Sequence, residues 1–271
     1  MGITDGIGAA RISDAIQQVA HRIRPRSIVT LHHLACSGGT IITKALGAMS
    51  GSIVLSEIHP DRAAQPAFHP LSQLRGGYGE LLSEAHGKAI RAHFRNEIGI
   101  AHAIAKSSGR TLIVRDHAHA DFVWAGRKNS LLLDQLKSHF SVTPIVTVRD
   151  PREVWLSVKR EGWFEGTIDE LCQAHCNLLD AFPDAPVIRY EDFAAQPAKT
   201  VERMCRIVGI GFEPDFQSRL DNVRHLTGDS GRKSSVIEPR PPKPLPDADQ
   251  AAFENSDAFA EFSRRMGYGS W

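Results

Sequence analysis

Short apolar runs alternate with helical stretches along most of the chain, and this alternation constrains the fold more than any other feature. Continuous apolar or β-branched runs typical of strands occur at 27–31, 53–55, 111–114, 144–148 and 187–190. Continuously apolar strands are buried on both faces, as in parallel sheets. The pattern predicts an α/β fold: a doubly wound, mainly parallel sheet of about five strands with helices on both faces.

Helical periodicity fills the segments between these runs. Thr167 and Glu170 have the spacing of a capping box at the start of one predicted helix. Further helices are predicted within 1–26, after residue 40, and over about 79–106, 197–209 and 257–266. The Pro- and Gly-rich stretch 59–79 is predicted to be a loop. We expect a single domain over 1–271: the helix of 1–26, an α/β core over 27–235, and a Pro-rich stretch with a C-terminal helix over 236–271.

The charge balance narrows the range of partners. Lys plus Arg number 32 and Asp plus Glu 31, for a formal net charge of +1. This balance argues against nucleic acid and other extended polyanions, which are bound by chains with a large cationic excess, but it permits one focused anion site. The four cysteines form no CxxC pair, no run approaches about 18 apolar residues, and no secretory signal is evident. We expect a cytoplasmic protein without a membrane span.

The loop after the first strand is the first candidate site. Ser37-Gly38-Gly39-Thr40 lies between a buried strand and a helix, where small residues let successive amides point at one anion and the helix N-terminus adds positive potential. The alternative is an ordinary tight turn. A P-loop NTPase would carry Gly-Lys-Ser/Thr here, whereas the nearest lysine, Lys44, comes a turn too late.

A second candidate follows the fourth strand. Arg149 lies at the carboxyl end of that strand, Pro151 suits the first turn of a helix, and Ser157 lies about two turns into it. Both Arg149 and Ser157 are able to reach one anion, the arginine through a two-pronged hydrogen bond. The alternative is an arginine paired with Asp150 or Glu153 beside a solvent-facing serine.

Together these motifs resemble those of the sulfotransferases that use 3′-phosphoadenosine 5′-phosphosulfate (PAPS). The resemblance extends over most of 27–235: a strand–loop–helix at 28–46, Arg149 and Ser157 eight positions apart, Tyr190-Glu191-Asp192 followed by Pro197 and Gly209, and a late basic segment at 228–233. It implies a P-loop NTPase-like sulfotransferase fold, PAPS as donor, adenosine 3′,5′-bisphosphate as product, and no metal. The nucleotide-binding residues that it implies are Cys36, Ser37, Gly38, Gly39, Thr40, Ile41, Arg149, Ser157, Tyr190, Gly231, Arg232 and Lys233.

The chain departs from the family at two of these positions. Many relatives have Lys or Arg where this chain has Cys36, and that cation helps to neutralise the leaving phosphate. His32, His33 and Arg115 are the alternatives for this role. Ile41 replaces a common aromatic residue near the nucleotide. These differences leave a slow enzyme, an altered donor and a non-catalytic relative as alternatives.

Sulfuryl transfer also needs a base for the acceptor proton. His117 follows the third strand, as the catalytic histidine does in many relatives, and a histidine with a pKa of about 6.5 is largely neutral at working pH. His119 and Glu57 are the next candidates. With 13 histidines in the chain, the alternative is that a histidine lies near this strand end incidentally.

The sequence thus predicts a PAPS-dependent sulfotransferase that acts on a hydroxyl or amine of a small-molecule or carbohydrate acceptor. The alternatives are a nucleotide or small-molecule kinase on a related fold and a non-catalytic PAPS-binding relative.

Two further predictions concern residues outside these motifs. Cys172, His175 and Cys176 share one helix face, where core packing is favoured over metal binding. Arg240 and Lys243, in the Pro-rich stretch, are predicted to lie in a solvated linker.

Overall fold

The computed structural model describes residues 26–61, 81–223, 226 and 236–269. Three predicted features lie wholly or mostly outside these residues: residues 1–25 of the N-terminal helix predicted over 1–26, most of the loop 59–79, and the basic segment 228–233. The predicted roles of Gly231, Arg232 and Lys233 are therefore not addressed by the described structure.

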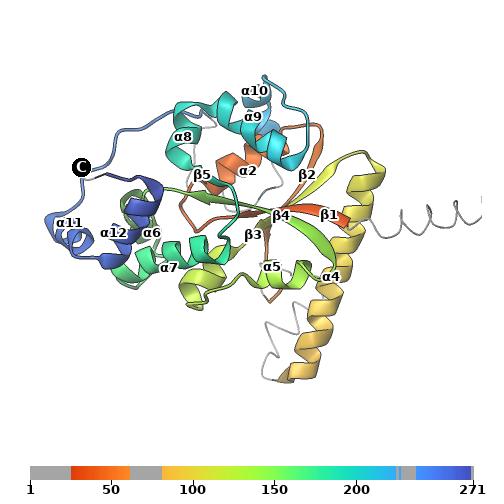
Figure 1. Ribbon diagram of the computed structural model, residues 1–271, viewed down its shortest axis with the longest axis horizontal. Coiled ribbons are helices and arrows are strands. Elements are labelled where there is room, and N and C mark those ends of the chain that lie inside the picture. Colours follow the sequence, from red (N-terminus) through yellow and green to blue (C-terminus); the bar gives the residue numbers. More distant parts are fainter. Residues whose placement is uncertain (1–25, 62–80, 224–225, 227–235, 270–271) are drawn as a thin grey trace, which may run out of the picture.

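Five parallel strands form one sheet, which confirms the predicted α/β class. The strands are β1 (Arg26–His32), β2 (Ser52–Ile58), β3 (Thr111–Asp116), β4 (Phe140–Val148) and β5 (Val187–Arg189), in the order β2-β3-β1-β4-β5 (Figure 1). β1 lies at the centre, where Thr30 is in register with Val114 of β3 and Pro144 of β4.

Helices surround the sheet much as the periodicity predicts. The predicted helices are α2 (Gly39–Gly47), α4 (Glu84–Ser107), α6 (Pro151–Glu161), α7 (Ile168–Ala181), α9 (Pro197–Val208) and α12 (Asp257–Met266). The sequence did not predict α5 (Leu131–Leu136), α8 (Tyr190–Ala195), α10 (Phe216–Arg219) or α11 (Asp247–Glu254), nor the π-helical turn Ala120–Trp124 and the 3-10 turn Leu220–Asn222. Two boundaries were also wrong: α4 begins at Glu84 rather than near residue 79, and Tyr190 opens α8 instead of ending β5.

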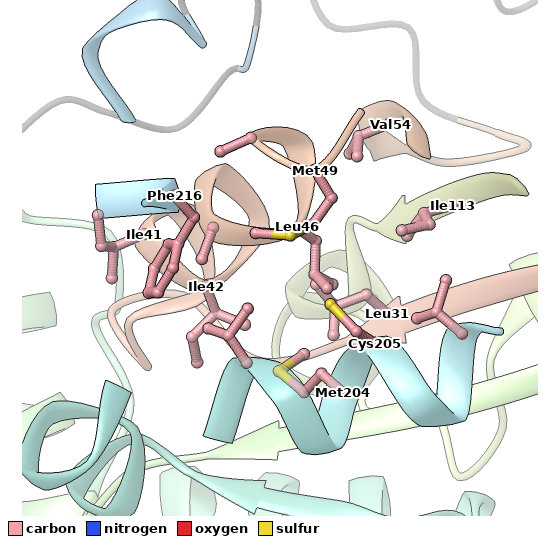
Figure 2. Close-up of a cluster of buried hydrophobic side chains, with 14 of the residues drawn as sticks. Leu31, Ile41, Ile42, Leu46, Met49, Val54, Ile113, Met204, Cys205 and Phe216 are labelled. Carbon is pink, nitrogen blue, oxygen red and sulfur yellow. The ribbon is translucent and has the colours of Figure 1, made fainter. Parts of the chain in front are cut away.

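Both faces of the sheet are buried, as the continuous apolar strands predict. Leu31 and Ile113 point toward α2 and α9, where they join a cluster with Leu46 and Met204 (Figure 2). Side chains one position along the strands point to the opposite face and pack against α4, α5 and α7 in separate clusters: Ile28, Leu112, Val114, Val146 and Val148. The two-residue period of a strand therefore gives each face its own apolar layer.

The strand order brings two predicted motifs together. β1 lies between β3 and β4, so the chain leaves β1 toward one side of the sheet and later continues from β4 to β5 on the other. In open α/β sheets, ligands bind at such a reversal, beyond the carboxyl ends of the strands. The loop after β1 meets there the segment 149–157 after β4, which we call the Arg149 block.

Local signals fix the helices on which the site depends. Asp150 caps α6 by accepting a hydrogen bond from the Arg152 amide, and Pro151 follows at the first helical position. Thr167 and Glu170 form the predicted capping box of α7. Because α6 begins directly after the strand-end loop, Arg149 is held at the carboxyl edge of the sheet.

Candidate active site

A cavity of about 750 Å³ opens at the carboxyl edge of the sheet, a size that suits a small-molecule ligand. Its lining combines the loop 33–36, the start of α2, Glu57 and Arg115 from the ends of β2 and β3, and the Arg149 block. Cys36 and Glu57 both line this cavity, and they are the two non-glycine residues with positive φ within the described ranges, at 63° and 54°. Such backbone strain collects at functional sites, which supports a functional role for this cavity.

The start of α2 has several features that suit an anion. Gly38 caps the helix in the left-handed region at φ 77° and, as a glycine, offers no side chain to hydrogen-bond the amides of the first turn. The Ser37 hydroxyl is buried and has no hydrogen-bond partner among the described residues. The amides at the start of α2, the helix dipole and the orphaned buried hydroxyl of Ser37 together suit a phosphate or sulfate group.

Two aromatic rings explain why both glycines stand in this loop. A Cβ added at Gly39 would lie 1.9 Å from Nε2 of His33, and one at Gly38 would lie 2.1 Å from the ring of Tyr190. Neither position accepts a side chain unless a ring moves. The two glycines therefore let His33 and Tyr190 press onto the loop backbone, and Gly38 also provides the positive φ.

Among the three residues considered in place of the family's cation, Arg115 brings a positive charge to the cavity wall. The Arg115 guanidinium is buried at the cavity wall, where Nε donates to His33 Nε2 at 2.9 Å and Nη2 donates to Glu57 Oε1 at 3.2 Å. Since His33 accepts this bond at Nε2, its proton is on Nδ1 and the ring is neutral. Burial, followed by the charge of Arg115, holds the pKa of His33 well below 6.5. Of the three alternatives, Arg115 is thus the fixed positive charge on the cavity wall.

His32, the remaining alternative, has both ring nitrogens engaged by buried partners. Its ring is fully buried between Asp116 Oδ2 and Thr30 Oγ1, at 2.8 Å from each. Ser130 donates to the same Asp116 oxygen, so the three side chains tie the end of β3 to β1. This network fixes the strand end from which His117 follows.

Cys36 contributes its backbone rather than its thiol. Its carbonyl oxygen accepts a hydrogen bond from Arg149 Nη1 at 3.2 Å. Burial, reinforced by the charge of Glu161, raises the pKa of the Cys36 thiol to about 11. The loss of solvent therefore outweighs the potential of the nearby helix N-terminus, which would lower the pKa of a thiol.

The candidate bases occupy different places. Glu57 lines the cavity in its ion pair with Arg115. His117 is half-buried beside the Trp124 ring, and burial lowers its pKa while the charge of Glu57 acts in the opposite direction. His119 is buried, with its Nδ1 accepting from the Ala35 amide at 3.4 Å, and burial lowers its pKa to about 3. Its basic nitrogen is therefore already engaged with the loop.

Arg149 has two side-chain partners among the described residues, and the sequence did not predict one of them, Tyr190. Arg149 stacks over the Tyr190 ring, with its guanidinium carbon 4.8 Å from the ring centroid, and donates from Nη2 to Glu153 Oε2 at 2.9 Å. The Ser157 hydroxyl donates to the Glu153 carbonyl oxygen at 2.9 Å, and both Ser157 and Tyr190 line the cavity. The alternative pairing of Arg149 with Glu153 is thus present, while the serine faces the cavity and not bulk solvent.

Several other predicted site residues also lie at the cavity. Gly38, Gly39, Thr40 and Ile41 line it. Arg240 and Lys243 are exposed, as the prediction of a solvated stretch expects, but sequence reasoning missed that they also line the cavity. The positive charge of these two side chains was the only available signal. No local sequence pattern indicates that the chain brings them to the anion-binding motifs.

The cysteine–histidine face of α7 packs as core. Cys172, His175 and Cys176 are buried, and the His175 ring packs edge-on against Phe262 with His175 Nδ1 2.8 Å from the Leu171 carbonyl oxygen. Within the described ranges, no group of three or more His, Cys, Asp or Glu side chains is arranged to hold a metal ion. Among the described helices, none combines the length and apolar character that a membrane span requires.

Comparison with known proteins finds sequence similarity over part of the chain. No family model matches it. Carbohydrate sulfotransferase 5 of Mus musculus is 25% identical over 118 residues, a match that covers 32% of this chain and 30% of that protein. The match therefore spans less than a third of the curated relative's length.

Two solved structures share the whole architecture. The sulfotransferase domain from the Synechococcus PCC 7002 olefin synthase superposes with a TM-score of 0.60 at 18% identity and covers 91% of this chain and 96% of that domain. The sulfotransferase domain from the curacin biosynthetic pathway gives a TM-score of 0.58 at 16% identity, with 90% and 98% covered. The chain is an α/β protein with the sulfotransferase fold, and the resemblance predicted from its motifs is confirmed at this level.

Proposed function

We propose that this protein is a sulfotransferase that moves a sulfuryl group from PAPS to a hydroxyl or amine of a small-molecule or carbohydrate acceptor. The observation that carries the proposal is that two elements suited to anions line one cavity: the start of α2, and Arg149 with Ser157. A donor with a phosphosulfate at one end and a 3′-phosphate at the other requires two such elements. The name of the mouse relative supports a carbohydrate among the candidate acceptors.

The donor would be held at both ends. The amides at the start of α2 and the Ser37 hydroxyl suit the 5′-phosphosulfate, whose charge the α2 dipole would stabilise. Arg149 and Ser157 suit the 3′-phosphate, and the Tyr190 ring beside Arg149 offers a face to the nucleoside. Gly231, Arg232 and Lys233, implied by the family resemblance, remain proposed contributors.

Transfer would proceed by in-line displacement at sulfur. The acceptor oxygen or nitrogen forms a bond to sulfur while the bond from sulfur to the bridging phosphate oxygen breaks, and adenosine 3′,5′-bisphosphate leaves. Arg115 and the amides at the start of α2 stabilise the charge that develops on the leaving oxygen. The acceptor proton passes to the base.

His117 is the proposed base. Its burial favours the neutral ring, which has a lone pair to accept the proton, and Glu57 lies close enough for its charge to act on the ring. Glu57, on the cavity wall, remains the second candidate. His119 ranks last because its Nδ1 accepts the Ala35 amide and its other ring nitrogen carries the proton.

The experiment that tests this function is turnover of isotope-labelled PAPS against a panel of sugars, phenols, alcohols and amines. The proposal expects transfer of label to at least one class, with His117→Ala reducing the rate. Donor binding without transfer to any member of the panel would favour the non-catalytic alternative. The predicted cytoplasmic location stays a proposal.

A further inference from the structure

Glu153 occupies the centre of the Arg149 block. It lies one helical turn after Arg149 and one turn before Ser157 on α6. Its Oε2 accepts from Arg149 Nη2 at 2.9 Å, and its carbonyl oxygen accepts the Ser157 hydroxyl at 2.9 Å. The two side chains proposed to bind a phosphate therefore both contact Glu153 in this structure.

The other carboxylate oxygen of Glu153 reaches a distant part of the chain. Glu153 Oε1 accepts a hydrogen bond from the Lys243 backbone amide at 2.8 Å, across 90 positions. Lys243 lies between Pro242 and Pro244, which have no amide hydrogen. Lys243 is thus the single backbone donor within 241–244, and it is directed at Glu153.

The Pro-rich segment 236–246 is anchored on both sides of the cavity. Ile237 is buried in the cluster on the α2 and α9 face, and Leu245 packs against the cluster between α6, α7 and α11. Between these anchors, the stretch 239–243 lines the cavity. Figure 1 shows this segment running from the side of α8 and α9 to α11. Glu153 hydrogen-bonds the segment at Lys243, between the two anchors.

A guanidinium and a backbone amide that converge on one carboxylate have the geometry of an anion site. We propose that Arg149 and the Lys243 amide form such a site, that the Glu153 carboxylate occupies it here, and that the 3′-phosphate of the nucleotide takes the place of Glu153. The identity of the anion rests on the proposed function. Lys243 then becomes a binding residue of the donor site, and Glu153 a built-in competitor for it.

The competition has a measurable consequence. A phosphate that enters must displace a carboxylate and stay close to its negative charge. Glu153→Gln keeps the shape and the acceptor oxygen but removes the charge. We expect adenosine 3′,5′-bisphosphate to bind this variant about tenfold more tightly than the wild type, or about 1.4 kcal/mol. Unchanged or weaker binding by Glu153→Gln would overturn the inference.

Glu161→Gln is the matched control. Glu161 also lines the cavity, but its carboxylate pairs with Arg160 and contacts neither Arg149 nor Lys243. The substitution Glu161→Gln removes one negative charge from the same cavity. A general electrostatic effect would therefore tighten bisphosphate binding equally in both variants. The inference expects a change of about twofold or less for Glu161→Gln, because its charge is partly screened. Equal gains in the two variants would contradict it.

Amide signals report the exchange directly. The chain has nine lysines, so protein labelled with ¹⁵N-lysine gives few backbone signals, and Lys243→Arg identifies the one from Lys243. The inference expects this signal to shift when bisphosphate binds and when Glu153 becomes Gln. An unmoved Lys243 amide in the bisphosphate-bound protein would contradict it.

A second titration with inorganic phosphate separates this inference from the proposed function. Phosphate that shifts the Lys243 amide and binds more tightly to Glu153→Gln supports the anion site even if bisphosphate does not bind, in which case the proposed function fails alone. Bisphosphate binding that leaves Lys243 unmoved preserves the function and overturns the inference. If neither anion binds to either protein, both fail.

Discussion

Arg149 Nη1 donates a hydrogen bond to the backbone carbonyl oxygen of Cys36, 3.2 Å away, although 113 positions separate the two residues. The bond joins the loop after β4 to the loop after β1, whose strands are neighbours in the sheet. The positive φ of Cys36, 63°, belongs to the same turn. One contact thus couples the proposed 3′-phosphate site to the loop proposed to hold the phosphosulfate.

Gly39→Ala tests the close contact between the His33 ring and the loop. The new Cβ would meet His33 Nε2 at 1.9 Å, so the ring or the loop has to move. We expect a loss of about 1–3 kcal/mol in the free energy of unfolding, measured by urea titration, together with weaker nucleotide binding. Gly211→Ala is the control, because a Cβ there meets nothing within 4 Å. Equal effects of the two variants would contradict this explanation of Gly39.

Arg115→Gln tests which residue supplies the cation. Arg115 brings a buried positive charge to the cavity wall beside His33, whereas Cys36 contributes a carbonyl and a neutral thiol. We expect kcat to fall by about 10²–10³-fold in Arg115→Gln. Cys36→Ser keeps the backbone, and we expect a change of less than about fivefold, since a neutral hydroxyl replaces a neutral thiol. A larger loss in Cys36→Ser than in Arg115→Gln would reverse the two roles.

The pH dependence of kcat tests the proposed base. Burial lowers the pKa of His117, so the ring loses its proton at a pH below 6.5. A base works in its deprotonated form, so kcat should rise with pH through a pKa below 6.5 and then level off. His117→Ala should lower kcat by about 10²–10⁴-fold and remove this inflection. If Glu57→Gln removes the inflection while His117→Ala retains it, Glu57 is the base.

The buried His175 side chain is predicted to lower the free energy of unfolding in acid. Burial lowers its pKa to about 4, against about 6.5 when unfolded. Below pH 6.5 the unfolded chain therefore binds a proton that the folded chain does not, and stability falls as the pH falls toward 4. At pH 5 this one residue costs about 2 kcal/mol relative to pH 7.

Urea unfolding of wild type and His175→Gln at the two pH values measures this cost. The variant should lose about 2 kcal/mol less than the wild type between pH 7 and pH 5. Comparing each protein with itself cancels the packing change that the substitution makes beside Phe262. Identical losses would show that His175 does not contribute to the acid sensitivity.

The sheet could be predicted from the sequence because its signals are local. Each strand is an apolar run, and the capping residues Thr167 and Asp150 stand within a few positions of the helices they start. Arg149 and Ser157 could be found because one strand end and one short helix set their separation. The unpredicted helices are mostly short, such as α5 and α10 with 6 and 4 residues, so they have little periodicity to detect.

The remainder of the site depends on contacts that no local pattern encodes. Lys243 meets Glu153 across 90 positions, and Arg115 meets His33 across 82. The composition of the Pro-rich stretch 236–246 indicates a linker. That Ile237 and Leu245 anchor it in two core clusters is apparent only from the structure. Likewise, the raised pKa of Cys36 follows from burial, which composition and spacing do not give.

The most direct test of the central claim is calorimetric titration with adenosine 3′,5′-bisphosphate, beside a titration with ATP and Mg²⁺. The account predicts saturable bisphosphate binding, little binding of ATP with Mg²⁺, and bisphosphate affinity lowered by about 10–100-fold in Arg149→Ala. Arg206→Ala, an exposed arginine on α9, should bind as the wild type does. Bisphosphate binding that survives Arg149→Ala, or preference for ATP with Mg²⁺, would contradict the account.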